Sequence, residues 1–185
     1  MTQRPETQTH EPRAPEAEGH DPLRRKLLLA GLAFGLITPV QALAFSGGDA
    51  AQVNALLATG GLALQTSVVA LQRSPNPNVR AFARSEIAEQ RQINAAITGS
   101  PRPAVPPGPR GAAILAEAES LPGGLAFDRV YVRRQIEGHR QLLVLAGGYA
   151  EAGADPNVAA VAAGALPLIR LHLATLRRLN GDLVG

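Results

Sequence analysis

Two histidines are the residues of this chain best suited to chemistry, because each lies in a run that is otherwise apolar. His139 follows the helical apolar spacing of segment 126–152, and His172 follows that of segment 157–179. A histidine on an apolar stripe needs partners for its ring nitrogens. Imidazole is also a common proton carrier and metal ligand. The two positions therefore predict a polar site inside the protein.

A carboxylate and an amide on a third segment fit the same site. Glu86 and Gln90 share the inner stripe of segment 78–97. If the turns near residues 75 and 154 lie at one end of a bundle, the 1.5 Å helix rise places both side chains roughly 16 to 22 Å from that end. The same count places His139 and His172 at about 22 and 27 Å. We therefore expect one inner layer formed by Glu86, Gln90, His139 and His172.

This layer has three interpretations from sequence alone. The four side chains could form a hydrogen-bonded network with no ligand. They could hold a divalent transition metal, since histidine and carboxylate from facing helices are frequent ligands in bundles. They could also line a small-ligand pocket or an active site. A di-iron centre fits poorly, because it requires Glu-x-x-His on two helices. No catalytic triad, phosphate loop or nucleotide-binding motif is visible, so we assign no catalytic residue and no further cofactor.

The elements that position this layer are all predicted to be helical. Apolar residues recur every three or four positions in four long segments and one short segment, and no strand pattern is visible. The long segments are 49–72, 78–97, 126–152 and 157–179, and the short one is 112–120. Five prolines make 99–109 a stiff connection. The pattern predicts an all-α, antiparallel up-down-up-down four-helix bundle with a Pro-rich crossing between its second and third helices.

The N-terminal part of the sequence predicts export. Residues 1–22 are rich in Pro, Glu and Thr, which is typical of a disordered leader. Residues 23–44 contain a basic patch, an apolar run and an Ala-x-Ala ending, which predicts a signal peptide cleaved after Ala44. Arg24-Arg25 is compatible with the twin-arginine route, and ordinary secretion fits as well. We expect residues 45–185 to form the bundle domain, in the periplasm or outside the cell.

Composition limits the classes of partner. The 185-residue chain has no cysteine, which excludes disulfides and zinc-thiolate sites. Its net charge is only +3 and its arginines are scattered, which argues against nucleic-acid binding. The apolar run of the signal is short for a bilayer span of about 20 residues, so membrane contact is expected only through an uncleaved signal. The remaining partners are an unknown protein, a small ligand, or a second copy in a homodimer.

Three blocks of sequence resemble a known bacterial family. They are NPNVRAFARSEIAEQRQIN at 76–94, LPGGLAFDRVYVRRQIEGHRQ at 121–141 and GALPLIRLHLATL at 164–176. In content, order and spacing they resemble the exported proteins grouped as domain of unknown function 4142, over about residues 49–179. The resemblance implies a ferritin-like four-helix bundle in the periplasm or outer envelope. Members are often labelled putative outer-membrane proteins, although this chain shows no barrel pattern.

The resemblance also bears on the inner layer. It implies histidines in the third and fourth helices, which match His139 and His172. It further implies Asp-His in the second helix, where this chain has Glu89-Gln90, and a glutamate in the first helix, where this chain has the apolar run 62–64. One imidazole and one carboxylate are thus missing, which predicts weak metal binding or none.

Taken together, the sequence predicts an exported bundle without enzymatic turnover, acting as a binding or stress-associated module. The alternative is a metal-binding or ferritin-like redox protein that uses Glu86, His139 and His172. Neither the substrate nor the partner is encoded in a recognisable motif.

Overall fold

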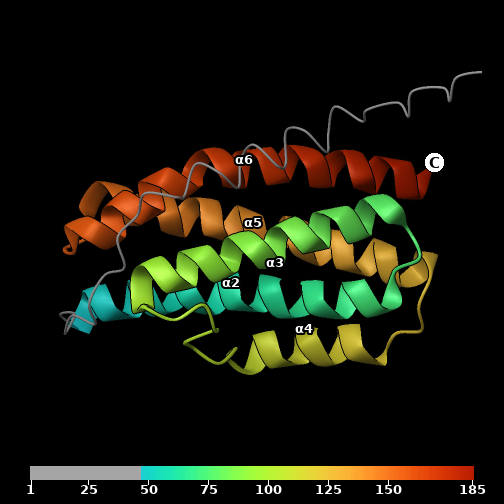
Figure 1. Cartoon of the computed structure of the whole chain (residues 1–185), viewed down its shortest axis with the longest axis horizontal. Helices are drawn as coiled ribbons and strands as arrows, with labels where there is room; N and C mark the ends of the chain where they lie inside the picture. Colours follow the sequence, from blue (N-terminus) through green and yellow to red (C-terminus); the bar gives the residue numbers. More distant parts are fainter. Residues whose placement is uncertain (1–46) are drawn as a thin grey trace, which may run out of the picture.

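Residues 47–185 are described by the computed structural model, and all their regular structure is helical (Figure 1). The helices are α2 (Gly47–Arg73), α3 (Pro77–Thr98), α4 (Pro109–Ser120), α5 (Leu125–Ala152) and α6 (Pro156–Val184). No strand occurs within residues 47–185. The all-α prediction is confirmed, and the predicted helix ends lie within a few residues of those observed. The leader predicted at 1–22 and the signal peptide predicted at 23–44 lie outside the described residues.

The two helices that follow tight turns begin in the same way. Asn76 caps α3 and Asp155 caps α6, each accepting hydrogen bonds from the backbone N–H groups two and three residues further on. Pro77 and Pro156 then occupy the first helical position, where the missing N–H costs nothing. Such a cap stabilises a helix start by about 1 kcal/mol. These local signals fix where α3 and α6 begin.

The core is divided into two apolar clusters at opposite ends of the helices. One contains the start of α2, the ends of α3 and α5 and the start of α6, including Val53, Ile97 and Tyr149. The other contains the end of α2, the starts of α3 and α5 and the end of α6, including Phe82 and Leu179. The polar layer lies between these clusters, near the middle of the helices. Apolar packing on both sides therefore fixes its depth.

The membership of these clusters corrects the predicted order of the bundle. Neighbouring long helices do run antiparallel, but α3 and α5 run in the same direction, so the chain order is not up-down-up-down. The reason is the crossing between α3 and α5. It contains α4, which runs back along α2 and returns the chain to the end where α3 began (Figure 1). The Arg73 guanidinium anchors the end of this crossing by donating to the backbone oxygens of Glu119 and Leu121.

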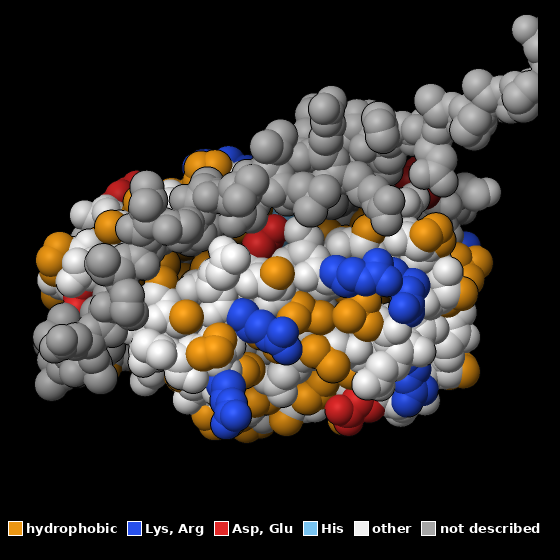
Figure 2. Space-filling model, viewed as in Figure 1, with side chains coloured by type: hydrophobic (Ala, Val, Ile, Leu, Met, Phe, Trp, Pro, Cys, Tyr) orange, Lys and Arg blue, Asp and Glu red, His pale blue; other side chains and the backbone are white. Residues whose placement is uncertain are grey.

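Helices α2 and α6 are long and apolar enough to meet a length-and-composition test for membrane spans, in the stretches Asp49–Arg73 and Pro156–Val184. About half of each apolar window is buried against other helices, 56% and 50% respectively. Core helices of globular proteins meet the same test. On the face shown in Figure 2, positively charged side chains are scattered among hydrophobic ones and form no continuous patch.

Candidate metal centre

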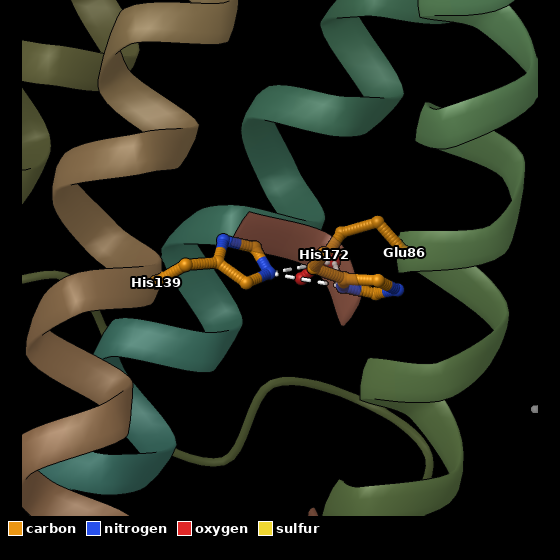
Figure 3. Close-up of side chains that lie close together, drawn as sticks. All are labelled: Glu86, His139 and His172. Atoms are coloured by element: carbon orange, nitrogen blue, oxygen red, sulfur yellow. Dashed lines mark hydrogen bonds and ion pairs between the residues drawn. The ribbon is translucent and has the colours of Figure 1, made fainter. Parts of the chain in front are cut away.

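Glu86, His139 and His172 form one buried cluster, called here the inner cluster (Figure 3). They come from α3, α5 and α6, and each is at most 2% exposed. His139 Nε2 lies 3.0 Å from His172 Nδ1. Glu86 Oε2 lies 3.2 Å from His139 Nε2 and 2.9 Å from His172 Nδ1. Three potential ligand atoms thus form a nearly equilateral triangle in the interior.

The size of this triangle suits a metal ion. Protein nitrogen and oxygen ligands bind Zn²⁺ and similar ions at about 2.0–2.2 Å. Two ligands at about 2.1 Å in neighbouring octahedral positions are therefore about 3.0 Å apart, and tetrahedral ligands about 3.4 Å apart. An ion could bind all three atoms from just outside the triangle with little movement of the side chains. Two histidines and one carboxylate on one face of an ion form a recurring site that leaves other positions open.

The outer nitrogen of each imidazole faces an oxygen. His139 Nδ1 lies 2.9 Å from the backbone oxygen of Gln135, and His172 Nε2 lies 2.9 Å from Glu89 Oε2. Glu89 is held in turn by a hydrogen bond from Ser85 Oγ to its Oε1. Histidines that bind metals almost always direct their other ring N–H to a carboxylate or a backbone carbonyl in this way. With a proton on each outer nitrogen, the inner nitrogens present lone pairs to the centre.

The oxygen of Glu86 that faces the histidines is short of donors. Glu86 Oε2 is buried and receives no properly directed hydrogen bond from any described residue, although two ring nitrogens lie close to it. Its other oxygen accepts a hydrogen bond of 3.0 Å from Gln90 Nε2. Gln90 therefore fixes the carboxylate so that Oε2 points to the centre. An unpaired buried carboxylate oxygen is costly, and a bound cation would remove that cost.

The remaining long helix, α2, contributes space rather than a side chain. At Gly60 of α2, an added Cβ would lie only 2.3 Å from Gln90 Oε1. A side chain at this position would therefore push the Gln90 amide away from its place between α2 and the cluster. Thr59, the nearby hydroxyl, is directed elsewhere and donates to Ala55 O.

The carboxylates around His172 determine its charge. Burial lowers the pKa of His172, but the carboxylates of Glu86 and Glu89 close to its ring nitrogens outweigh it and raise the pKa from 6.5 to about 10. Burial raises the pKa of Glu86, yet the two imidazoles outweigh this and hold it well below its usual 4.5. Without a metal, His172 is thus a cation paired with carboxylates at neutral pH. A metal ion would take the place of one of its protons.

The structure brings all four predicted residues of the layer together. Glu86, His139 and His172 supply the converging atoms, and Gln90 contacts the cluster through Glu86 rather than through its own oxygen. Sequence reasoning missed Glu89 as a partner of His172. The signal was present, because Glu89 lies three residues after Glu86 on one side of the same helix.

Comparison with known proteins gives one match. The family model described as "Domain of unknown function (DUF4142)" matches residues 37–179. No curated protein and no solved structure matches this chain.

Proposed function

This chain belongs to the DUF4142 family, and from that premise we propose that it binds one divalent transition metal through Glu86, His139 and His172. The proposal makes it a metal-binding helical-bundle protein of the cell envelope. It assigns no catalytic residue.

The observation that carries the proposal is the meeting of three ligand atoms with both outer imidazole nitrogens already facing acceptors. The inner atoms lie 2.9 to 3.2 Å apart, and one of them lacks a donor. A single proton can join only one pair of these atoms. A metal ion can join all three, which is why the geometry supports an ion over a closed hydrogen-bonded network.

The directions of the helices support a ferritin-like classification of this bundle. Ferritin-like bundles have one long crossover connection among four antiparallel-packed helices. The segment between α3 and α5 is such a connection, and residues on facing helices of these bundles commonly bind metals.

Export is the second part of the proposal. It depends on the sequence pattern of residues 23–44, with cleavage after Ala44. Cell fractionation and mass measurement of the purified protein test it. We expect a periplasmic or extracellular protein that begins at Phe45. Uncleaved protein confined to the cytoplasm would contradict it.

Metal analysis of protein purified without chelator tests the binding site. We expect about one equivalent of iron, manganese, zinc or copper in the native protein, and loss of that metal in the His139→Ala, His172→Ala double variant. Glu137→Gln provides a matched control, because this half-exposed carboxylate pairs with Arg134 and not with the cluster. Absence of metal after incubation with each of the four ions would contradict the proposal.

A further inference from the structure

A partly open pocket lies between α2, α4 and α5. Its volume is about 340 Å³, and small-molecule sites commonly have volumes of about 300–1,000 Å³. The helix α4, which runs along α2 (Figure 1), forms one wall of the pocket with its first residues. Glu86, His139 and His172 do not line this pocket, so binding in it does not depend on the proposed metal site.

Aliphatic side chains form part of the wall. Ala55, Ala58 and Leu62 of α2 line the pocket together with Ile114 of α4. A hydrocarbon group that contacts these side chains is removed from water, which favours binding in proportion to the buried area. The pocket therefore suits a ligand with a short aliphatic body.

The start of α4 gives the pocket a positive end. The first hydrogen bond of this helix joins the N–H of Ala112 to Gly108 O, and no side chain caps the helix. The N–H groups of Arg110 and Gly111 are therefore left without helical partners at the positive end of the helix dipole. Both residues line the pocket, and the exposed Arg110 side chain adds a full charge. Such a helix start favours an anionic group.

A second, independent observation comes from Gln135 of α5, which also lines the pocket. This residue is 2% exposed, and its Oε1 is buried without a hydrogen-bond partner among the described residues. The orientation of the amide is fixed, because Nε2 donates to Ala63 O and Thr66 Oγ1 of α2. An unpaired buried acceptor is costly, and a hydroxyl group on a ligand would supply the missing donor.

The charges around the pocket favour a ligand with a single negative charge. Two arginines line the pocket, but Arg134 already pairs with Glu117 and Glu137. Arg110 makes no ion pair with any residue in the range 47–185, so one cation is available. A monoanionic carboxylate balances this charge, whereas a dianionic phosphate would leave one negative charge uncompensated beside Glu137.

We propose that this pocket binds a small aliphatic hydroxy acid. Its carboxylate lies at the start of α4, with Arg110 beside it, and its hydroxyl donates to Gln135 Oε1. Its hydrocarbon chain packs against the aliphatic side chains of α2 and α4.

Nuclear magnetic resonance titration of the protein tests this proposal with 2-hydroxy-4-methylpentanoate, used as each enantiomer. The backbone amide signals of Arg110, Gly111 and Gly138 should shift and saturate with at least one enantiomer. Two related probes separate the contacts. The compound 4-methylpentanoate lacks only the hydroxyl, 2-hydroxy-4-methylpentanamide lacks only the charge, and each should bind several-fold more weakly. Absence of shifts at the pocket, or equal affinity for all three probes, would overturn the proposal.

A glycine in the wall allows the pocket to be filled. Gly138 of α5 lines it, and an added Cβ there would meet no atom within 4 Å. Gly138→Leu should therefore fold, since leucine also favours a helix more than glycine does, and it should weaken binding of the hydroxy acid by at least tenfold. Gly148→Leu is the matched control, because Gly148 has equal space on the same helix but lies outside the pocket. Equal affinities in these two variants would overturn the proposal.

A second pair of variants removes charge without changing the shape of the pocket wall. Arg110→Gln should weaken binding of the hydroxy acid severalfold and leave binding of the uncharged amide unchanged. Arg102→Gln is its control, because Arg102 is exposed and does not line the pocket. Both arginines are exposed, so these variants keep the proposal testable if Gly138→Leu does not fold. Equal affinity of Arg110→Gln and Arg102→Gln for the hydroxy acid would contradict the placement of the carboxylate.

Discussion

Two buried polar clusters lie side by side in this protein, and they solve the problem of burial differently. The first is the inner cluster of Glu86, His139 and His172. The second, called here the amide–hydroxyl cluster, joins α2 to α5 and consists of Thr66, Ser67, Tyr131 and Gln135.

In the amide–hydroxyl cluster, the donors find acceptors within the protein. Gln135 Nε2 donates to Ala63 O, Thr66 Oγ1 and Ser67 Oγ at 3.0 to 3.3 Å, and Ser67 Oγ pairs with the Tyr131 hydroxyl at 2.8 Å. Burial raises the pKa of Tyr131 well above 10, so its hydroxyl keeps its proton. Such a network stabilises helix packing, and the one buried atom of it without a partner among the described residues is an amide oxygen, Gln135 Oε1.

In the inner cluster, two ring nitrogens and a carboxylate oxygen face one another instead. His139 Nδ1 pairs with the backbone oxygen of Gln135, and His172 Nε2 lies 2.9 Å from Glu89 Oε2 without a properly directed hydrogen bond. The inner atoms converge on a point that a cation would fill. We therefore propose that the hydrogen bonds of the amide–hydroxyl cluster are structural and that the inner cluster is a binding site. The following predictions test whether the two clusters separate in this way.

The largest effect is expected from Glu86→Gln. The substitution keeps the shape of the side chain but removes the only charged ligand, so we expect metal affinity to fall by at least about 100-fold, more than the loss of a supporting partner costs. Isothermal titration with Zn²⁺ or Co²⁺ measures this. The metal-induced rise in unfolding temperature should vanish in parallel. Glu137→Gln should bind as the native protein does, and equal affinities in the two variants would contradict the assignment.

A smaller loss is expected from Glu89→Gln. Glu89 holds His172 through the outer nitrogen, and loss of such a partner typically costs 10- to 100-fold in metal affinity. The amide still fills the same space, so the variant should fold. Unchanged metal affinity in a folded Glu89→Gln protein would show that Glu89 does not position the ligand.

Metal affinity should also rise with pH, by up to about tenfold per unit below the His172 pKa of about 10. The reason is that the ion must displace a proton from His172. Titrations at several pH values between 6 and 9 measure the slope. A flat profile would contradict the combination of a raised His172 pKa and metal binding through His172.

The stability of the metal-free protein should show the opposite trend. The raised pKa of His172 gives a stabilisation that is complete below pH 6.5 and lost as the pH rises from 6.5 to about 10. The lowered pKa of Glu86 gives a second stabilisation, which is present above pH 4.5 and is lost as the pH falls below that value. Denaturant titrations should therefore show that the inner cluster contributes most to the free energy of unfolding between about pH 4.5 and 6.5. The loss of stability above pH 6.5 should be smaller in His172→Gln.

The smallest effect is expected from Tyr131→Phe in the amide–hydroxyl cluster. The variant loses one hydrogen bond to Ser67, so we expect the free energy of unfolding to fall by about 1 kcal/mol. Metal affinity should not change. A large loss of metal affinity in Tyr131→Phe would show that the two clusters act as one.

The sequence predicted the helices well because their signals are local. Asn76-Pro77 and Asp155-Pro156 mark helix starts, and apolar periodicity marks the buried stripes. The directions of α5 and α6 in the bundle were predicted wrongly, because periodicity does not encode the course of the crossing between α3 and α5. The helix piece predicted at 112–120 exists, but its path along α2 depends on long-range contacts such as that of Arg73.

The inner layer was nevertheless placed at the correct depth. Glu86, His139 and His172 lie near the middle of their helices, so counting from either end gives nearly the same level. The spacing of Glu89 after Glu86 placed it on the same side of its helix, but its pairing with His172 depends on the position of that residue on another helix. Gln135 was not assigned to the site, since its contribution to His139 is a backbone oxygen that no side-chain pattern reveals.

An anomalous-difference map from crystals grown with cobalt or zinc tests the central claim most directly. The account predicts one peak about 2.0–2.2 Å from Glu86 Oε2, His139 Nε2 and His172 Nδ1. A map with no peak at the cluster, and with the three atoms still at hydrogen-bonding distance from one another, would contradict it.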